Sequence, residues 1–90
     1  MYAFAVRFEQ DAVGVAVMCR DLPELNSYGD DLPHAISEAV DAIETVFSLY
    51  MDQRRAFPQA TPPQAGEHVV QLPAATLAQI EVWNLLVGRP

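Results

Sequence analysis

Large hydrophobic residues alternate strictly with small or charged residues at the start of the chain, which is the pattern of a half-buried β-strand. One face carries Tyr2, Phe4, Val6 and Phe8, and the other carries Ala3, Ala5, Arg7 and Glu9. Successive side chains of a strand point to opposite faces of its sheet. This period of two residues therefore predicts a strand with its aromatic face in the core.

A second β-rich run at residues 13–19 follows a short turn at residues 10–12, so the two runs predict a hairpin. Residues 21–24 interrupt the pairing, because Pro23 has no amide hydrogen to donate to a neighbouring strand. Residues 26–29 are long enough only for a short third strand, which we expect at an edge of the sheet.

Residues 31–55 carry the clearest helical pattern of the chain. Asp31 is suited to cap the helix, Pro33 is tolerated in its first turn, and Arg54 and Arg55 suit the negative C-terminal pole. The apolar stripe comprises Ile36, Ala39, Val40, Ile43, Val46, Phe47, Tyr50 and Met51. The opposite arc comprises Ser37, Glu38, Asp41, Glu44, Ser48 and Asp52. One face is thus predicted to bury, and the other to present carboxylates to solvent.

The remaining chain predicts a loop, a strand and a second helix. Residues 56–67 hold three prolines and no periodicity, residues 68–72 form a strand that Pro73 stops, and residues 76–87 show helical spacing before Gly88. The order indicates an α+β domain, β-β-β-α-β, with a helix against one sheet face and a further C-terminal helix. The residues expected to pack together in its core are Phe4, Val6, Phe8, Ile36, Ile43 and Phe47.

Composition restricts the class of function. The 90 residues suffice for one domain, and twelve acidic side chains against five arginines, with no lysine, give a net charge of −7. Such a surface repels nucleic acid and anionic membranes and attracts a basic partner. No apolar run approaches the ~20 residues of a membrane span, and no signal pattern precedes the first strand, so we expect a cytoplasmic protein.

The sequence predicts no catalytic, metal or cofactor site, and therefore no enzyme. His34 and His68 lack a second ligand at metal-binding spacing, and Cys19 ends an apolar run, as a buried thiol does. One alternative stays open, because carboxylates at strand ends could hold the metal ions of a nuclease. These carboxylates are Asp11, Asp21, Asp30 and Asp31. A turn role for Asp11 and a cap role for Asp31 are the commoner uses of such residues.

Several short motifs, taken in order, resemble the N-terminal domain of the HicB antitoxins. They are Asp21-Leu22-Pro23-Glu24, Tyr28-Gly29-Asp30-Asp31, Ala35-Ile36-Ser37-Glu38-Ala39 and, after the prolines of the loop, His68-Val69-Val70-Gln71-Leu72-Pro73. The resemblance extends from residue 1 to about residue 87. It departs from the family pattern where Glu24 and Leu25 replace a frequent glycine–cysteine pair, and where Asp31 replaces a capping threonine.

The resemblance implies a fold and a domain organisation. Residues 1–72 would be a reduced RNase-H-like, toxin-binding domain with a Pro-rich loop at 56–67. Residues 73–90 would be a helix that leads toward a DNA-binding module, and this module is absent from the chain. The chain would then be either an excised toxin-binding domain or a naturally short member of the family.

The resemblance also implies a function, which is to bind and occlude a HicA-type mRNA-cleaving toxin of basic charge. The residues expected to contact that toxin are Asp21, Glu24, Glu38, Asp41 and Glu44. We expect a homodimer or higher oligomer, with no cofactor, and with operator DNA bound only through the missing module. The alternatives are a residual metal-dependent nuclease and a dimerisation module of a transcriptional regulator.

Overall fold

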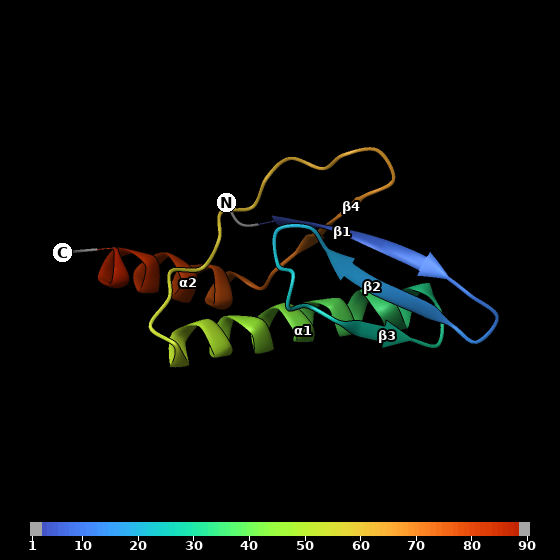
Figure 1. Ribbon diagram of the computed structural model, residues 1–90, viewed down its shortest axis with the longest axis horizontal. Helices are drawn as coiled ribbons and strands as arrows, with labels where there is room; N and C mark the ends of the chain where they lie inside the picture. The colour runs from blue at the N-terminus through green and yellow to red at the C-terminus, as the bar shows by residue number, and fades with distance from the viewer. Residues whose placement is uncertain (1–2, 89–90) are drawn as a thin grey trace.

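The computed structural model describes residues 3–88, and its elements follow the predicted order. They are β1 (Ala3–Gln10), β2 (Val15–Cys19), β3 (Ser27–Gly29), α1 (Leu32–Asp52), β4 (His68–Gln71) and α2 (Ala74–Val87). The four strands form one sheet in the order β3-β2-β1-β4, and each neighbouring pair is antiparallel. Helix α1 packs on one face of the sheet and α2 extends from one end of the molecule (Figure 1). The predicted α+β class is confirmed.

Strands β1 and β2 form the predicted hairpin, but its turn is longer than the sequence suggested. Oδ1 of Asp11 accepts hydrogen bonds from the backbone N–H groups of Val13 and Gly14, at 2.7 and 2.9 Å. These bonds hold Val13 in the turn, where its side chain is 82% exposed. Strand β2 therefore begins at Val15 rather than at residue 13.

Helix α1 begins as predicted. Asp31 is its N-cap, and the carboxylate accepts the backbone N–H of His34 at 2.9 Å. Strand β3 passes the first turn closely, since a Cβ placed on Gly29 would lie 2.4 Å from the backbone nitrogen of Ala35. The helix ends at Asp52, so the predicted pair of arginines follows its last residue.

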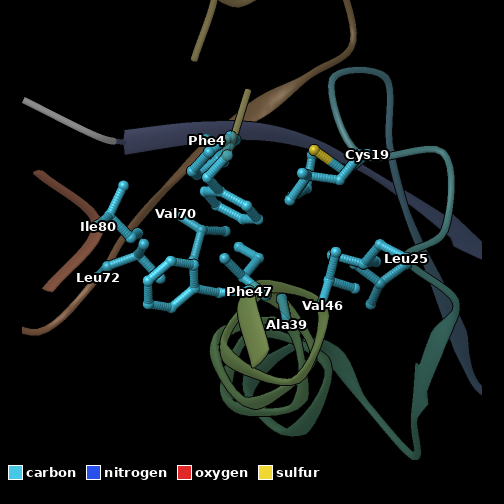
Figure 2. Packing of buried hydrophobic residues seen from close by; sticks show 14 of the residues in the cluster. Phe4, Cys19, Leu25, Ala39, Val46, Phe47, Val70, Leu72 and Ile80 are labelled. Atoms are coloured by element: carbon cyan, nitrogen blue, oxygen red, sulfur yellow. The ribbon is translucent and has the colours of Figure 1, made fainter. Parts of the chain in front are cut away.

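The core lies between α1 and the inner face of the sheet and continues to α2 (Figure 2). Phe4, Val6, Ile43 and Phe47, all predicted to be core residues, are at most 2% exposed. Leu22, in the segment between β2 and β3, is fully buried as well. The segment that links these two strands is therefore part of the packed domain.

Two core predictions need correction. Ile36 is 43% exposed, whereas Ala35 beside it is fully buried. The backbone of the first turn of α1 lies directly against Gly29 of β3, with Ala35 on the buried side and Ile36 beside it toward solvent. Phe8 is only half-buried, at the margin of the core, and its ring centroid lies 5.8 Å from that of His68. Tyr2, predicted on the same strand face, lies outside the described residues.

The Pro-rich loop at residues 56–67 is anchored in the core by Phe57. Its side chain is 2% exposed, and its ring centroid lies 5.5, 5.2 and 5.4 Å from those of Phe4, Phe47 and Tyr50. The side chain of Asn84 in α2 accepts the backbone N–H of Phe57 at 2.7 Å and donates to its carbonyl at 3.1 Å. The start of the loop thus joins α1, β1 and α2.

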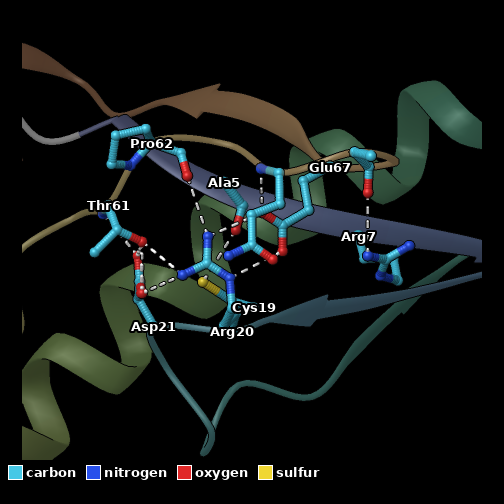
Figure 3. Close-up of polar contacts among 10 residues, drawn as sticks. Ala5, Arg7, Cys19, Arg20, Asp21, Thr61, Pro62 and Glu67 are labelled. Carbon is cyan, nitrogen blue, oxygen red and sulfur yellow. Dashed lines mark hydrogen bonds and ion pairs between the residues drawn. The ribbon is translucent and has the colours of Figure 1, made fainter.

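Arg20, directly after β2, holds the rest of the loop (Figure 3). Its guanidinium donates to Thr61 Oγ1 at 2.7 Å and to the carbonyl of Pro62 at 3.2 Å. The same group contacts the carboxylates of Glu67 at 3.0 Å and Asp21 at 3.2 Å. Because these two acidic side chains are only 4% and 10% exposed, Arg20 supplies the positive charge that their burial requires.

Helix α2 packs one side against the core. Ile80 is fully buried and belongs to the same core cluster as β1 and α1, and Thr76 is 8% exposed. Nε1 of Trp83 donates to the carbonyl of Arg55 at 2.8 Å, which ties α2 to the chain just after α1. The domain division at residue 72 stays a prediction, although α2 contributes directly to the core.

Candidate functional site

A groove of about 270 Å³ lies between α1 and the segment that leads into β3. It is lined by Glu24, Asn26, Ser27, Glu38, Asp41, Ala42, Thr45 and Val46. Three of the five carboxylates predicted to contact a partner meet there, Glu24 from the segment before β3, and Glu38 and Asp41 from α1. The two helical residues are three positions apart, a spacing that brings side chains together on one face of a helix. We call this feature the acidic groove.

Glu24 is held in a fixed position in the acidic groove. The hydroxyl of Tyr50 donates to both of its carboxylate oxygens, at 3.0 and 2.8 Å, and Nη1 of Arg55 lies 3.6 Å away. Arg55 also stacks over the Tyr50 ring, 4.1 Å from its centroid. The backbone N–H of Glu24 itself, followed by Tyr50 and Arg55, lowers the pKa of the Glu24 carboxyl. Glu24 is therefore a positioned negative charge at neutral pH.

Glu38 and Asp41 contribute negative charge at the helix side of the acidic groove. Oε1 of Glu38 lies 3.1 Å from Nε2 of His34, while Nδ1 of that ring accepts the backbone N–H of Asp30 at 3.0 Å. Since Nδ1 accepts a hydrogen bond, Nε2 carries the proton that is donated to Glu38. Asp41 is exposed, and its carboxylate has no hydrogen-bond or ion-pair partner within residues 3–88. It is therefore open to an incoming cation.

The other two predicted contact residues have intramolecular partners outside the acidic groove. Asp21 accepts the backbone N–H of Thr61 at 2.8 Å, besides its contact with Arg20. Oε2 of Glu44 accepts a hydrogen bond from the hydroxyl of Thr76 in α2. Contact of Asp21 and Glu44 with a partner stays a prediction, and each already joins separate parts of the domain.

Two of the strand-end carboxylates considered for a nuclease, Asp11 and Asp31, have structural roles. Asp11 holds the hairpin turn and accepts the hydroxyl of Tyr28 at 2.8 Å, and Asp31 caps α1. Across residues 3–88, no three His, Cys, Asp or Glu side chains group closely enough to hold a metal ion. In the same part of the chain, neither helix combines the length and apolar character needed to cross a membrane.

Sequence reasoning missed the residues that position Glu24. Tyr50 was assigned to the apolar stripe, and it is indeed 3% exposed, but its hydroxyl reaches a carboxylate 26 positions earlier in the chain. A buried tyrosine usually finds a partner for its hydroxyl, which is a general signal that such a group exists. The identity of that partner depends on the tertiary fold.

Acid should destabilise this fold through three carboxyl groups. Backbone N–H groups of Gly14 and Val13 lower the pKa of Asp11, its own backbone N–H lowers the pKa of Glu24, and Arg20 lowers the pKa of Glu67. A group whose pKa is lower in the folded state contributes stability above its unfolded pKa, and that contribution is lost as pH falls through the folded value. We therefore expect the free energy of unfolding to decrease as pH falls below about 4.5.

Chemical denaturation at a series of pH values measures this dependence. Glu67→Gln should weaken it, because the amide cannot titrate and cannot pair with Arg20 as a charge. Glu81→Gln, on the exposed surface of α2, removes the same charge from the chain as a whole and serves as the control. An unchanged pH slope in Glu67→Gln would exclude the Arg20–Glu67 contact as a source of acid sensitivity.

The fold and the groove define a small α+β domain that presents fixed negative charge beside its longest helix. Residues 1–81 match the model of the HicB_like antitoxin family of bacterial toxin–antitoxin systems. The chain belongs to this family, and the resemblance seen in the sequence motifs is confirmed.

Curated relatives agree with the family match. The chain is 35% identical over 88 residues to antitoxin HicB of Pseudomonas fluorescens (strain Pf0-1), covering 97% of the chain and 60% of that protein. It is 38% identical over 84 residues to antitoxin HicB 2 of Photorhabdus laumondii, covering 93% and 59%. Antitoxin HicB of Escherichia coli (strain K12) is 25% identical over 71 residues, covering 79% and 51%. The chain thus spans between about half and three fifths of the length of these relatives.

Proposed function

We propose that this chain is the toxin-binding part of an antitoxin, and that it neutralises a basic, HicA-type mRNA-cleaving toxin by covering it. Family membership supports the antitoxin role. A basic partner is supported by one observation above all. Glu24, Glu38 and Asp41 lie together in one groove, and the chain has a net charge of −7. As part of the same proposal, the fold is a reduced RNase-H-like fold and the protein acts in the cytoplasm.

The acidic groove suits the side chains that an RNA-cleaving protein uses to hold its substrate. Phosphate is bound by arginine and lysine, and these side chains also pair with carboxylates. Glu24 is held in place by Tyr50 and Arg55, so little conformational freedom is lost when a cation binds to it. A toxin whose basic residues lie in this groove could not use them to bind RNA. The toxin would then be neutralised because its RNA-binding residues are occupied by the acidic groove, and the antitoxin would need no catalytic activity.

Reversal of charge in the acidic groove tests this function. The double variant Glu38→Lys, Asp41→Lys should bind a purified HicA-type toxin roughly 10-fold more weakly or worse, mainly through slower association with reduced salt dependence. Both residues lie outside the apolar stripe, so circular dichroism should show a folded domain. Surface plasmon resonance at low and physiological salt measures both rates. Glu44 is left unchanged in this variant because of its hydrogen bond to Thr76.

The matched control is Glu9→Lys, Asp52→Lys, which makes the same change in net charge at two exposed positions outside the groove. It should retain most of the affinity, and it should rescue growth of cells that express the toxin. If the folded groove variant bound and rescued as well as the control, the acidic groove would not be the contact surface.

A further inference from the structure

Arg55, shortly after the end of α1, places a positive charge at the margin of the acidic groove. Its Nη1 lies 3.6 Å from Oε2 of Glu24, and its Cζ lies 4.1 Å from the centroid of the Tyr50 ring. Arg55 does not line the groove itself. A cation at this distance offsets much of the charge of one of the three carboxylates that meet there. A partner of the groove therefore encounters less negative charge than the carboxylates alone would supply.

Glu24 is held chiefly by Tyr50 rather than by Arg55. The Tyr50 hydroxyl lies at hydrogen-bond distance from both carboxylate oxygens, 3.0 and 2.8 Å, whereas the 3.6 Å to Nη1 of Arg55 is too long for a hydrogen bond. Tyr50 is itself 3% exposed, and its ring packs edge to face with that of Phe57. Tyr50 therefore keeps the carboxylate in place when the guanidinium moves away.

The backbone of Arg55 is fixed, but its side chain can move. The backbone N–H donates to the carbonyl of Tyr50 at 2.9 Å, and the carbonyl of Arg55 accepts Nε1 of Trp83 at 2.8 Å. The side chain is 50% exposed, and Nη1 also donates to Oε1 of Gln53 at 2.9 Å. Because exposed ion pairs are weak, a guanidinium with this second partner can leave Glu24 at little cost.

We propose that Arg55 is an internal counter-ion that competes with the toxin's cation for Glu24 and thereby limits the affinity of the acidic groove. This inference rests on the proposed function of the groove. A cation that enters beside Glu24 either displaces the Arg55 guanidinium toward Gln53 and solvent, or binds next to it against like-charge repulsion. Both routes reduce the gain from binding. Removal of the guanidinium should therefore strengthen toxin binding, whereas loss of a positioning residue would weaken it.

Arg55→Gln tests the competition by surface plasmon resonance with a purified HicA-type toxin at physiological salt. It should bind about 2–5-fold more tightly than the unmodified chain, the range that corresponds to an exposed ion pair. Arg54→Gln is the matched control, because it makes the same change in net charge at the neighbouring exposed position. Salt screens charges that do not contact Glu24, so this control should gain less than half as much. Arg55→Lys keeps the positive charge and should bind like the unmodified chain.

A double-mutant cycle with Glu24→Gln shows whether the effect passes through Glu24. In the Glu24→Gln background, Arg55→Gln should gain no more than the Arg54→Gln control, because the carboxylate for which Arg55 competes is absent.

The contact can also be followed without toxin. The backbone N–H of Glu24, then Tyr50 and then Arg55 lower the pKa of the Glu24 carboxyl. An NMR titration of Arg55→Gln should therefore show this pKa raised relative to the unmodified chain, and Arg54→Gln should leave it where it is.

Three results would overturn the inference. Weaker binding by folded Arg55→Gln would make Arg55 a positioning residue for Glu24. A gain no larger than that of Arg54→Gln, or one that persists in Glu24→Gln, would reduce the effect to overall charge. An unchanged Glu24 pKa in Arg55→Gln would exclude the ion pair.

Failure of the proposed function is recognised separately. The Glu38→Lys, Asp41→Lys variant would then bind the toxin as tightly as the unmodified chain. If that variant binds more weakly and Arg55→Gln gives no gain, the groove is the contact surface and only the competition by Arg55 is wrong.

Discussion

Replacement of Phe57 by alanine is expected to lower the free energy of unfolding by about 3–5 kcal/mol, the range for a fully buried phenylalanine. The side chain is 2% exposed and meets the rings of Phe4, Phe47 and Tyr50 edge to face. Such aromatic pairs add to the stability that burial alone provides. Small domains have only about 5–15 kcal/mol in total, so this variant should be close to unfolded at 37 °C.

Urea denaturation followed by circular dichroism measures the loss. Phe57→Leu keeps much of the buried volume and should retain more stability than Phe57→Ala. Val13→Ala, at an exposed position of the hairpin turn, should change stability by less than about 0.5 kcal/mol. A loss below about 1 kcal/mol for Phe57→Ala would show that the Pro-rich loop is only a connection and not part of the core.

The sequence predicted the elements of this fold well, because each has a strong local signal. Alternation along β1 and the three- and four-residue spacing of α1 placed Phe4, Val6, Ile43 and Phe47 in the core, where the structure has them. The cap at Asp31 depends only on the few residues that follow it, so it too could be predicted from local spacing. Features that depend on one element or one turn are therefore accessible from the sequence.

Features that depend on the contact between two separate elements could not be predicted from the sequence pattern. The apolar stripe alone could not tell that the first turn of α1 lies against Gly29 of β3, with Ala35 buried and Ile36 exposed. The loop around Phe57 has no periodicity, and its anchoring depends on Asn84, which lies 27 positions later. A single phenylalanine among prolines and polar residues is a weak hint of such an anchor.

The candidate site shows the same division. Helical spacing brought Glu38 and Asp41 together, and the structure adds Glu24 to them in the acidic groove. Asp21 and Glu44 look similar in sequence, but they accept hydrogen bonds from Thr61 and Thr76, which belong to distant segments. Which partners each carboxylate finds within the domain therefore depends on the tertiary fold, and contact of Asp21 and Glu44 with a toxin stays a prediction.

A matched pair of isoleucine variants on α1 separates the core side of the helix from its solvent side. Ile43→Ala should lower the free energy of unfolding by about 2–5 kcal/mol, because the side chain is fully buried against the sheet and leaves a cavity. Ile36→Ala removes the same atoms on the solvent side of α1, where the side chain is 43% exposed. It should lower the free energy of unfolding by less than half as much as Ile43→Ala. The two variants have the same change in helix propensity, so the difference between them isolates burial.

Urea denaturation of both proteins under identical conditions gives that difference directly. Equal losses for Ile36→Ala and Ile43→Ala would mean that Ile36 also packs in the core, as the apolar stripe alone predicts. A larger loss of stability for Ile36→Ala than for Ile43→Ala would mean that the side of α1 that carries Ile36 packs on the sheet, which would contradict the structure. The expected order follows from the burial of Ile43 and the exposure of Ile36. The same rotation of α1 places Glu38 and Asp41 at the acidic groove.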